Sequence, residues 1–250
     1  MLTIKDFSEN KLTSYKTLSY DSVVSGSDIT AKSRPVLAEH TMDIIVSGDG
    51  DIPNLEGGLS GITCTPLNLP ELAAGRLLTV GVIAASSDIK SISISEDGLR
   101  ADVELADIPA SKTSPDSPSD PFTWDNDMIF ALSRRFEEGL PLHKKTGAAH
   151  CCILMHNGHI IFECDDIGRH NALDKAIGYA LINDISLQRC IAFTSGRIPL
   201  DMVEKAVTAG IPVLASKASV TDEAVIAAKK YGLTLLAKVR PSSYERYVRV

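Results

Sequence analysis

The fold of this chain is decided by Asp165-Asp166-Ile167-Gly168-Arg169-His170-Asn171-Ala172-Leu173-Asp174-Lys175. Apolar residues before this stretch predict a strand, and apolar residues at helical spacing from Ala172 onward predict a helix. A helix that begins directly after a strand has free backbone N–H groups at its first turn, where an anion is favoured. Arg169, His170 and Lys175 add donors that suit phosphate. An ordinary capped helix with solvent-facing charges is the alternative interpretation.

The residues around this stretch continue the alternation of helix and strand to the end of the chain. We expect a helix over 127–138, a hairpin over 152–163 that turns at Asn157-Gly158, strands over 190–194, 211–215 and 233–239, and helices that begin at Pro199 and Thr221 and end at Gly210 and Gly232. The helix after Arg169 buries Ala172, Leu173, Ala176, Ile177, Ala180 and Leu181. This alternation predicts a three-layer α/β domain with a largely parallel sheet over 122–250.

The first half of the chain has short apolar runs that are broken by turn residues. The runs over 42–46 and 89–94 precede turn signals, and a helix is expected over 66–75, with Asn68 as its cap. We therefore expect a disordered or peripheral tail over 1–20 and a smaller, β-rich α+β domain over 21–110. Residues 111–121 are rich in Pro, Ser and Asp and are expected to form a linker or mobile loop.

Composition narrows the class of protein. The net charge of −7 argues against a nucleic-acid binder, because such proteins need a broad basic surface. No apolar run reaches the roughly 20 residues that cross a bilayer, and the polar start lacks the apolar core of a signal peptide. The five cysteines are odd in number and have no disulfide-framework spacing. We therefore expect a cytoplasmic protein that binds neither membranes nor nucleic acid.

Polar and mostly cationic loops follow four of the expected strands. They are 166–170, 195–197, 216–219 and 238–243. Because the carboxyl ends of parallel strands meet at one edge of a sheet, we expect these loops to converge there. An acidic protein that gathers basic loops at one place suits a polyanionic small molecule, such as a nucleotide or a pterin phosphate. Separate surface charges at strand ends are the alternative.

Four motifs resemble the formate dehydrogenase accessory sulfurtransferase family, FdhD. They are Thr146 to His150, Asp165 to Lys175, Ser195-Gly196-Arg197 with 201–206, and 218–221, and the likeness extends from about residue 40 onward. The resemblance implies an accessory protein that binds the molybdenum cofactor as bis-molybdopterin guanine dinucleotide, accepts sulfur from a cysteine desulfurase and serves formate dehydrogenase. It also implies a homodimer and a carboxyl-terminal domain with the cytidine deaminase fold.

The candidate cofactor-binding residues are taken from these loops and motifs. They are Gly168, Arg169, His170, Ser195, Gly196, Arg197, Lys238, Val239, Arg240, Pro241, Ser242 and Ser243, with a guanine nucleotide as the surrogate ligand. We expect no metal site, because His156 and His159 flank a hairpin turn and the Cys and His spacing does not match a zinc site.

The chain departs from the family at the sulfur carrier. In the family a Cys-x-x-Cys pair in the loop between the two halves carries sulfur as a persulfide, whereas this chain has no cysteine between Cys64 and Cys151. Cys151 is the candidate replacement, since a neighbouring imidazolium lowers a thiol pKa and His150 precedes it. A core position is the alternative for Cys151 and the interpretation for Cys164 and Cys190.

Three functions stay open from the sequence. The first is a sulfurtransferase that uses a displaced cysteine. The second is a chaperone that holds the cofactor without sulfur chemistry. The third is a nucleotide-acting enzyme on a deaminase-like scaffold.

Overall fold

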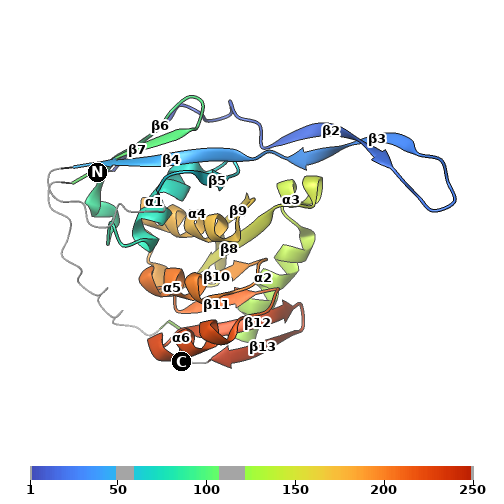
Figure 1. Cartoon of the computed structure of the whole chain (residues 1–250). Helices are drawn as coiled ribbons and strands as arrows, with labels where there is room; N and C mark the ends of the chain where they lie inside the picture. The colour runs from blue at the N-terminus through green and yellow to red at the C-terminus, as the bar shows by residue number, and fades with distance from the viewer. Residues whose placement is uncertain (1, 49–58, 107–121, 249–250) are drawn as a thin grey trace.

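Two β-sheets with helices between them make up the body of the molecule in the computed structural model, which describes residues 2–48, 59–106 and 122–248 (Figure 1). The first half supplies a five-stranded sheet with the order β1-β6-β7-β4-β5, and the second half supplies a six-stranded sheet with the order β13-β12-β11-β10-β8-β9. The expected linker over 111–121 lies outside the described residues. The fold is therefore a mixed α/β fold.

The five-stranded sheet and one helix account for most of the first half. Its elements are β1 (Thr3–Asp6), β4 (His40–Ser47), β5 (Ile62–Cys64), α1 (Leu69–Thr79), the short 3-10 helix η1 (Ser86–Asp88), β6 (Ile89–Ile94) and β7 (Arg100–Leu105). β1 lies within the expected tail over 1–20 and pairs with β6 at the edge of the sheet. Asn68 precedes α1 with φ of 53°, and its side chain makes no capping hydrogen bond. The capping that we expected at Asn68 is therefore not formed.

The six-stranded sheet is mixed, and only part of it is parallel. Its strands are β8 (His150–His156), β9 (His159–Asp166), β10 (Cys190–Thr194), β11 (Val213–Ser216), β12 (Thr234–Arg240) and β13 (Ser243–Val248). β10, β11 and β12 are parallel to one another, whereas β8, β9 and β13 enter through antiparallel pairs. The expectation of a largely parallel sheet is thus correct for the centre alone, because two tight hairpins add the remaining strands.

Helices cover both faces of this sheet. They are α2 (Asn126–Glu138), α3 (Pro141–Thr146), α4 (Arg169–Ile182), α5 (Leu200–Thr208) and α6 (Asp222–Tyr231), together with the 3-10 helix η2 (Leu187–Arg189). Buried residues of α4, α5 and α6 form one hydrophobic core with the first half, and α2 forms a second core on the opposite face. Thr221 accepts the amide of Ala224 at the start of α6, and Gly232 ends that helix, as the sequence predicts.

The two halves of the chain meet where α1 crosses α4 (Figure 1). A Cβ added to Gly75 would lie 1.8 Å from the carbonyl oxygen of Asp174, and one added to Gly178 would lie 1.8 Å from the carbonyl oxygen of Glu71. Only glycine permits two helix backbones to approach so closely. The crossing therefore fixes the position of α4, and with it the loop that precedes α4.

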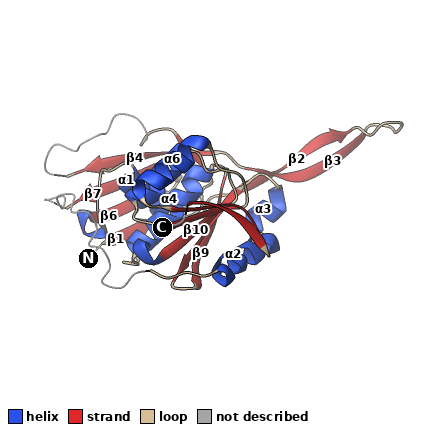
Figure 2. Cartoon of the chain, turned by 90° about the horizontal axis from the view of Figure 1, so that it is seen from below, coloured by secondary structure: helices blue, strands red, loops and turns tan. Residues whose placement is uncertain are grey.

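A two-stranded arm projects from the body (Figures 1 and 2). It consists of β2 (Tyr15–Ser22) and β3 (Thr30–Leu37), which pair only with each other. Its base is held by Arg34, whose guanidinium donates to the carbonyl of Thr146 at 3.0 Å, and by Lys145, whose ammonium lies 3.8 Å from the centre of the Tyr15 ring. Four apolar side chains of the arm are more than half exposed: Leu18, Val23, Val24 and Ile29.

Candidate functional site

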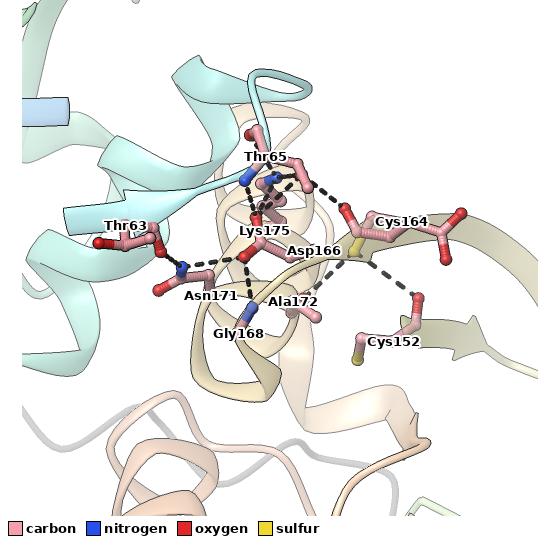
Figure 3. A network of polar contacts seen from close by, with 10 residues as sticks. Thr63, Thr65, Cys152, Cys164, Asp166, Gly168, Asn171, Ala172 and Lys175 are labelled. Atoms are coloured by element: carbon pink, nitrogen blue, oxygen red, sulfur yellow. Dashed lines mark hydrogen bonds and ion pairs between the residues drawn. The ribbon is translucent and has the colours of Figure 1, made fainter. Parts of the chain in front are cut away.

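A buried carboxylate organises the turn between β9 and α4 (Figure 3). One oxygen of Asp166 accepts from the amide of Gly168 at 2.8 Å and from the side chain of Asn171 at 2.9 Å. Its other oxygen accepts from the amide and hydroxyl of Thr65, at 3.0 and 3.1 Å, and from the ammonium of Lys175. Thr65 comes from the first half of the chain. The turn is therefore held in place by both halves.

This arrangement corrects our expectation that Lys175 would grip a phosphate. Lys175 is fully buried, and it donates to Asp166 and to the carbonyl and hydroxyl oxygens of Thr65, at 3.2 and 3.0 Å. An internal carboxylate already accepts from the amide of Gly168, at the start of α4. The anion-binding capacity of this turn therefore depends on the side chains that reach outward, and Arg169 is foremost among them.

A second buried carboxylate lies one turn further along α4. Asp174 accepts from the ammonium of Lys205 at 2.6 and 2.7 Å and from the hydroxyl of Thr79 at 2.9 Å, and it pairs with Arg76 at 3.4 Å. The carboxylate of Asp174 is therefore bonded inside the protein and does not face water.

The side chain of His170, in the first turn of α4, contacts α5. Its Nε2 lies 3.3 Å from a carboxylate oxygen of Asp201. Burial lowers the pKa of His170, and the charge of Asp201 opposes this shift.

Close packing joins the loop after β10 to the first residue of α4. A Cβ added to Gly196 would lie 2.9 Å from both Cβ and Cδ of Arg169, and 3.4 Å from Nδ1 of His150. Arg169 and His150 therefore both border the space that a side chain at position 196 would fill. Our site prediction left out His150, although it stands in one of the motifs. The signal that could have found it is its position at the start of β8, which is antiparallel to β10 and so begins at the edge where β10 ends.

Hydrogen bonds connect the loops after β10, β11 and β12. The hydroxyl of Ser216 donates to the carbonyl of Gly196 at 2.6 Å, and the amide of Lys238 donates to the carbonyl of Ala218 at 2.9 Å. The guanidinium of Arg240 donates to the carbonyl of Lys217 at 2.8 Å. The structure thus brings three of the four predicted loops into one bonded layer, and Arg169 joins the fourth to it.

Several candidate residues in this layer are occupied elsewhere. The ammonium of Lys238 pairs with Glu245 at 2.9 Å, and the side chain of Val239 is buried. Ser242 and Ser243 are exposed at the turn between β12 and β13, and Pro241 lies beside them. One terminal nitrogen of Arg240 donates to the carbonyls of Lys217 and Val239. These residues belong to the end of β12 and to the turn that leads into β13.

Two arginines keep donors available at this edge. Nε of Arg169 is buried and has no hydrogen-bond partner among the described residues. Neither terminal nitrogen of Arg169 is left both buried and unpaired in this way. Arg197 is exposed, and the described part of the chain offers no ion-pair partner to it. A guanidinium that is partly desolvated without a partner is costly, and an anion would offset that cost.

All five cysteines are buried thiols. Burial raises the pKa of Cys64, Cys151 and Cys190 to about 12, and it raises the pKa of Cys152 and Cys164 further. Cys151 packs against the α2 side of the sheet, and burial is the largest cause of its shift. The thiolate is the nucleophile in sulfur chemistry, so in this conformation Cys151 is a poor carrier at neutral pH.

Two cavities lie away from the loop layer. One of about 500 Å³ is bordered by the arm base, α3 and β9, where Tyr15, Lys145 and Asp165 line it. The other, of about 340 Å³, lies at the opposite edge of the sheet beside Trp124 and Tyr231. Neither of these two cavities is lined by a predicted cofactor-binding residue. The loop layer is a candidate site because of its hydrogen bonds and its charged side chains.

Among the described residues, no three His, Cys, Asp or Glu side chains come together as metal ligands. No helix in the described ranges is long and apolar enough to cross a bilayer.

Fold and site together define a class of protein: a two-sheet α/β protein whose polar loops are bonded to one another at the carboxyl edge of its six-stranded sheet. A family model for the FdhD/NarQ family matches residues 104–249. The chain is 32% identical over 212 residues to the sulfur carrier protein FdhD of Methanothermobacter thermautotrophicus, covering 77% of this chain and 84% of that protein. The chain belongs to the FdhD/NarQ family.

Two further relatives extend the match to nearly the whole chain. The sulfur carrier protein FdhD of Bacillus pumilus is 28% identical over 247 residues and covers 87% of this chain and 90% of its own. The crystal structure of a putative formate dehydrogenase accessory protein from Desulfotalea psychrophila superposes with a TM-score of 0.79 at 25% identity, covering 94% of this chain and 96% of its own. This chain therefore shares its fold with that solved protein over nearly its whole length.

Proposed function

We propose that this protein is a cytoplasmic accessory factor of formate dehydrogenase that holds bis-molybdopterin guanine dinucleotide, the cargo, through a guanine nucleotide portion at the loop layer. The observation that carries the proposal is Arg169, whose Nε is buried without a partner among the described residues. Arg197 lies on the neighbouring loop and supplies a second guanidinium. Two such groups suit the phosphates of a dinucleotide, because guanidinium binds phosphate with a planar pair of donors.

The comparisons support formate dehydrogenase as the partner in this proposal. Relatives of the chain are named sulfur carrier proteins, and the solved neighbour is named a formate dehydrogenase accessory protein. We accordingly propose formate dehydrogenase as the recipient. The family resemblance adds two further proposals, a cysteine desulfurase as the source of sulfur for the bound cofactor and a homodimer as the working form. The likeness of the carboxyl-terminal half to cytidine deaminases stays part of this proposal.

Titration with GDP tests the proposed site. Arg169→Ala and Arg197→Ala should each weaken GDP affinity about 10-fold or more, because a charge-assisted hydrogen bond contributes roughly 1.5–3 kcal/mol. Arg100→Ala is the matched control, since Arg100 is an exposed arginine that pairs with Asp102 on β7, in the other sheet. Isothermal titration calorimetry measures all three. Unchanged affinity in both site variants, or an equal loss in Arg100→Ala, contradicts the proposed site.

The burial of the thiols favours one version of this function over the other. A chaperone that holds the cofactor needs no exposed cysteine, whereas a sulfur carrier needs a thiolate that can attack and be attacked. Since burial raises the pKa of all five thiols, we propose that this chain holds the cofactor and carries no persulfide on its own cysteines.

Labelling separates the two versions. The protein is incubated with a cysteine desulfurase and radioactive cysteine, and sulfur that reducing agent releases from the protein is counted. We expect no such sulfur above the level of a variant in which Cys151 is replaced by serine. Label that depends on Cys151 would establish the sulfurtransferase version instead.

A further inference from the structure

We propose that Ser195 is a positioning residue, which holds His150 as a neutral imidazole with its Nε2–H directed outward as a hydrogen-bond donor to an oxygen of the bound anion. This inference deepens the proposed function and rests on it for the identity of the ligand as a phosphate. The geometry of three residues carries it: His150 and Cys151 at the start of β8, and Ser195 after β10.

The hydrogen bonds of Ser195 indicate which nitrogen of the His150 ring carries the proton. Ser195 Oγ lies 3.0 Å from the amide nitrogen of Cys151 and 3.1 Å from Nδ1 of His150. An amide can only donate, so Oγ accepts from Cys151. The hydroxyl keeps its own proton to donate, and we assign that proton to Nδ1, the acceptor 3.1 Å away, which is then the unprotonated ring nitrogen. A neutral ring with an unprotonated Nδ1 has its proton on Nε2.

Two hydrogen bonds to Cys151 hold Ser195, and they place its hydroxyl beside Nδ1 of His150. The amide of Ser195 donates to the carbonyl of Cys151 at 3.1 Å, and the hydroxyl of Ser195 accepts from the amide of Cys151. Gly196, which follows, has no side chain and so leaves room for both His150 and Arg169. Backbone contacts thus set the hydroxyl in place before any ligand binds.

The charges around His150 favour the neutral ring. The groups that face it are Arg169 from α4, His143 from α3 and Asp166 from β9. Burial lowers the pKa of His150 most, Arg169 and His143 lower it further, and Asp166 opposes them. The ring is therefore mostly neutral at pH 7, and it gains a proton only when the pH falls below the ordinary pKa of histidine.

The outer nitrogen of the ring is available to a ligand. Nε2 of His150 has no hydrogen-bond partner among the described residues, and it is absent from the buried unpaired atoms of that part of the chain, so it reaches solvent. It shares a surface with Arg169, since both side chains border Gly196. One neutral N–H and one guanidinium side by side suit a phosphate oxygen that carries a single negative charge.

Nitrogen-15 NMR of the ligand-free protein tests the tautomer. At neutral pH the His150 ring, assigned by its loss in His150→Gln, should show an unprotonated Nδ1 and a protonated Nε2. Ser195→Ala should raise the pKa of His150 and mix the two tautomers, because the hydroxyl donor to Nδ1 is gone. Ser195→Thr keeps a hydroxyl and should restore both readings. A protonated Nδ1 in the unaltered protein, or an unchanged ring in Ser195→Ala, overturns the proposal.

GDP titration then separates this inference from the proposed function. Ser195→Ala should weaken GDP binding about 5-fold, which corresponds to one hydrogen bond of roughly 1 kcal/mol, and Ser195→Thr should bind as the unaltered protein does. If the unaltered protein binds no GDP, the proposed function fails, whatever the tautomer. If GDP binds equally well to Ser195→Ala while the tautomer changes, the proposed contact of His150 with the ligand is overturned and the proposed function stands.

Discussion

Lys175 and Asp166 form an ion pair in which neither side chain is exposed to solvent. Two charges that leave water lose several kcal/mol of hydration each, and only good geometry with further hydrogen bonds compensates for this loss. Asp166 accepts five hydrogen bonds and Lys175 donates three. Each partner therefore depends on the other, and on Thr65, to stay charged in the interior.

Lys175→Met should destabilise the protein by about 3–5 kcal/mol, because it leaves a buried carboxylate without its cation. Chemical denaturation measures the change. Lys90→Met is the control, since Lys90 pairs with Glu104 at an exposed position, where such a pair contributes roughly 1 kcal/mol or less. The double variant Lys175→Met with Asp166→Asn should recover part of the loss. A loss from Lys175→Met no larger than that from Lys90→Met would show that the buried pair is not essential.

The sequence could not have predicted the roles of these charged residues. Asp165 to Lys175 indicates a strand end, a helix start and a cluster of charges, and all three are present. Whether Lys175 and Asp174 point inward depends on Thr65, Arg76, Thr79 and Lys205, which are distant in sequence. Arg169 and the loops after β10, β11 and β12 were predictable, because their placement follows from strand order alone.

At the scale of secondary structure elements, α1 and α4 cross with a close backbone approach at Gly75 and Gly178. Gly75→Ala should destabilise the protein by about 1–3 kcal/mol or more, although alanine favours an isolated helix by about 1 kcal/mol over glycine. The physical reason is the carbonyl of Asp174, which occupies the place of the new Cβ. Thermal unfolding and denaturant unfolding measure the change.

Gly26→Ala gives the comparison for this helix crossing. Gly26 has open space around its Cβ position, and its φ of 77° alone costs an alanine roughly 1–2 kcal/mol. It lies in the arm, outside the body. If Gly75→Ala costs no more than Gly26→Ala, the helices can separate without loss, and the crossing does not hold the halves together.

Elements with strong local signals were predictable, and elements without them were not. Asn157 and Gly158 both have positive φ, 48° and 82°, which is the turn that their sequence favours. β13 reads Ser-Tyr-Glu-Arg-Tyr-Val and is mostly exposed, so it offers no apolar run. The arm strands β2 and β3 are exposed on both faces, and their sequences therefore lack the alternation of a half-buried strand.

At the scale of the whole molecule, one hydrophobic core is shared by both halves. Residues of α1, β4, β6 and β7 lie in the same buried cluster as residues of α4, α5 and α6. The contacts of Thr65 with Asp166 and of Arg76 with Asp174 add buried polar links across the same boundary. The chain should therefore unfold as one cooperative unit, even though the sequence pattern changes between the halves.

A fragment of residues 122–250 tests this cooperativity. On its own it should lack a cooperative thermal transition and bind a hydrophobic dye, because it would expose the face of α4 that packs on α1. The full chain should unfold in a single transition that is the same by circular dichroism and by Trp124 fluorescence. A fragment with a sharp transition of its own would show that the halves are independent domains.

The link between Thr65 and Lys175 also bears on synthesis at the ribosome. The two residues are 110 positions apart, so at about 5–20 residues per second the second emerges roughly 5–20 s after the first. During that interval the face of α1 that packs on α4 has no partner, and Thr65 lacks the carboxylate of Asp166. The nascent amino-terminal half is thus a natural client for a chaperone, and a pause in translation before residue 175 would lengthen its exposure.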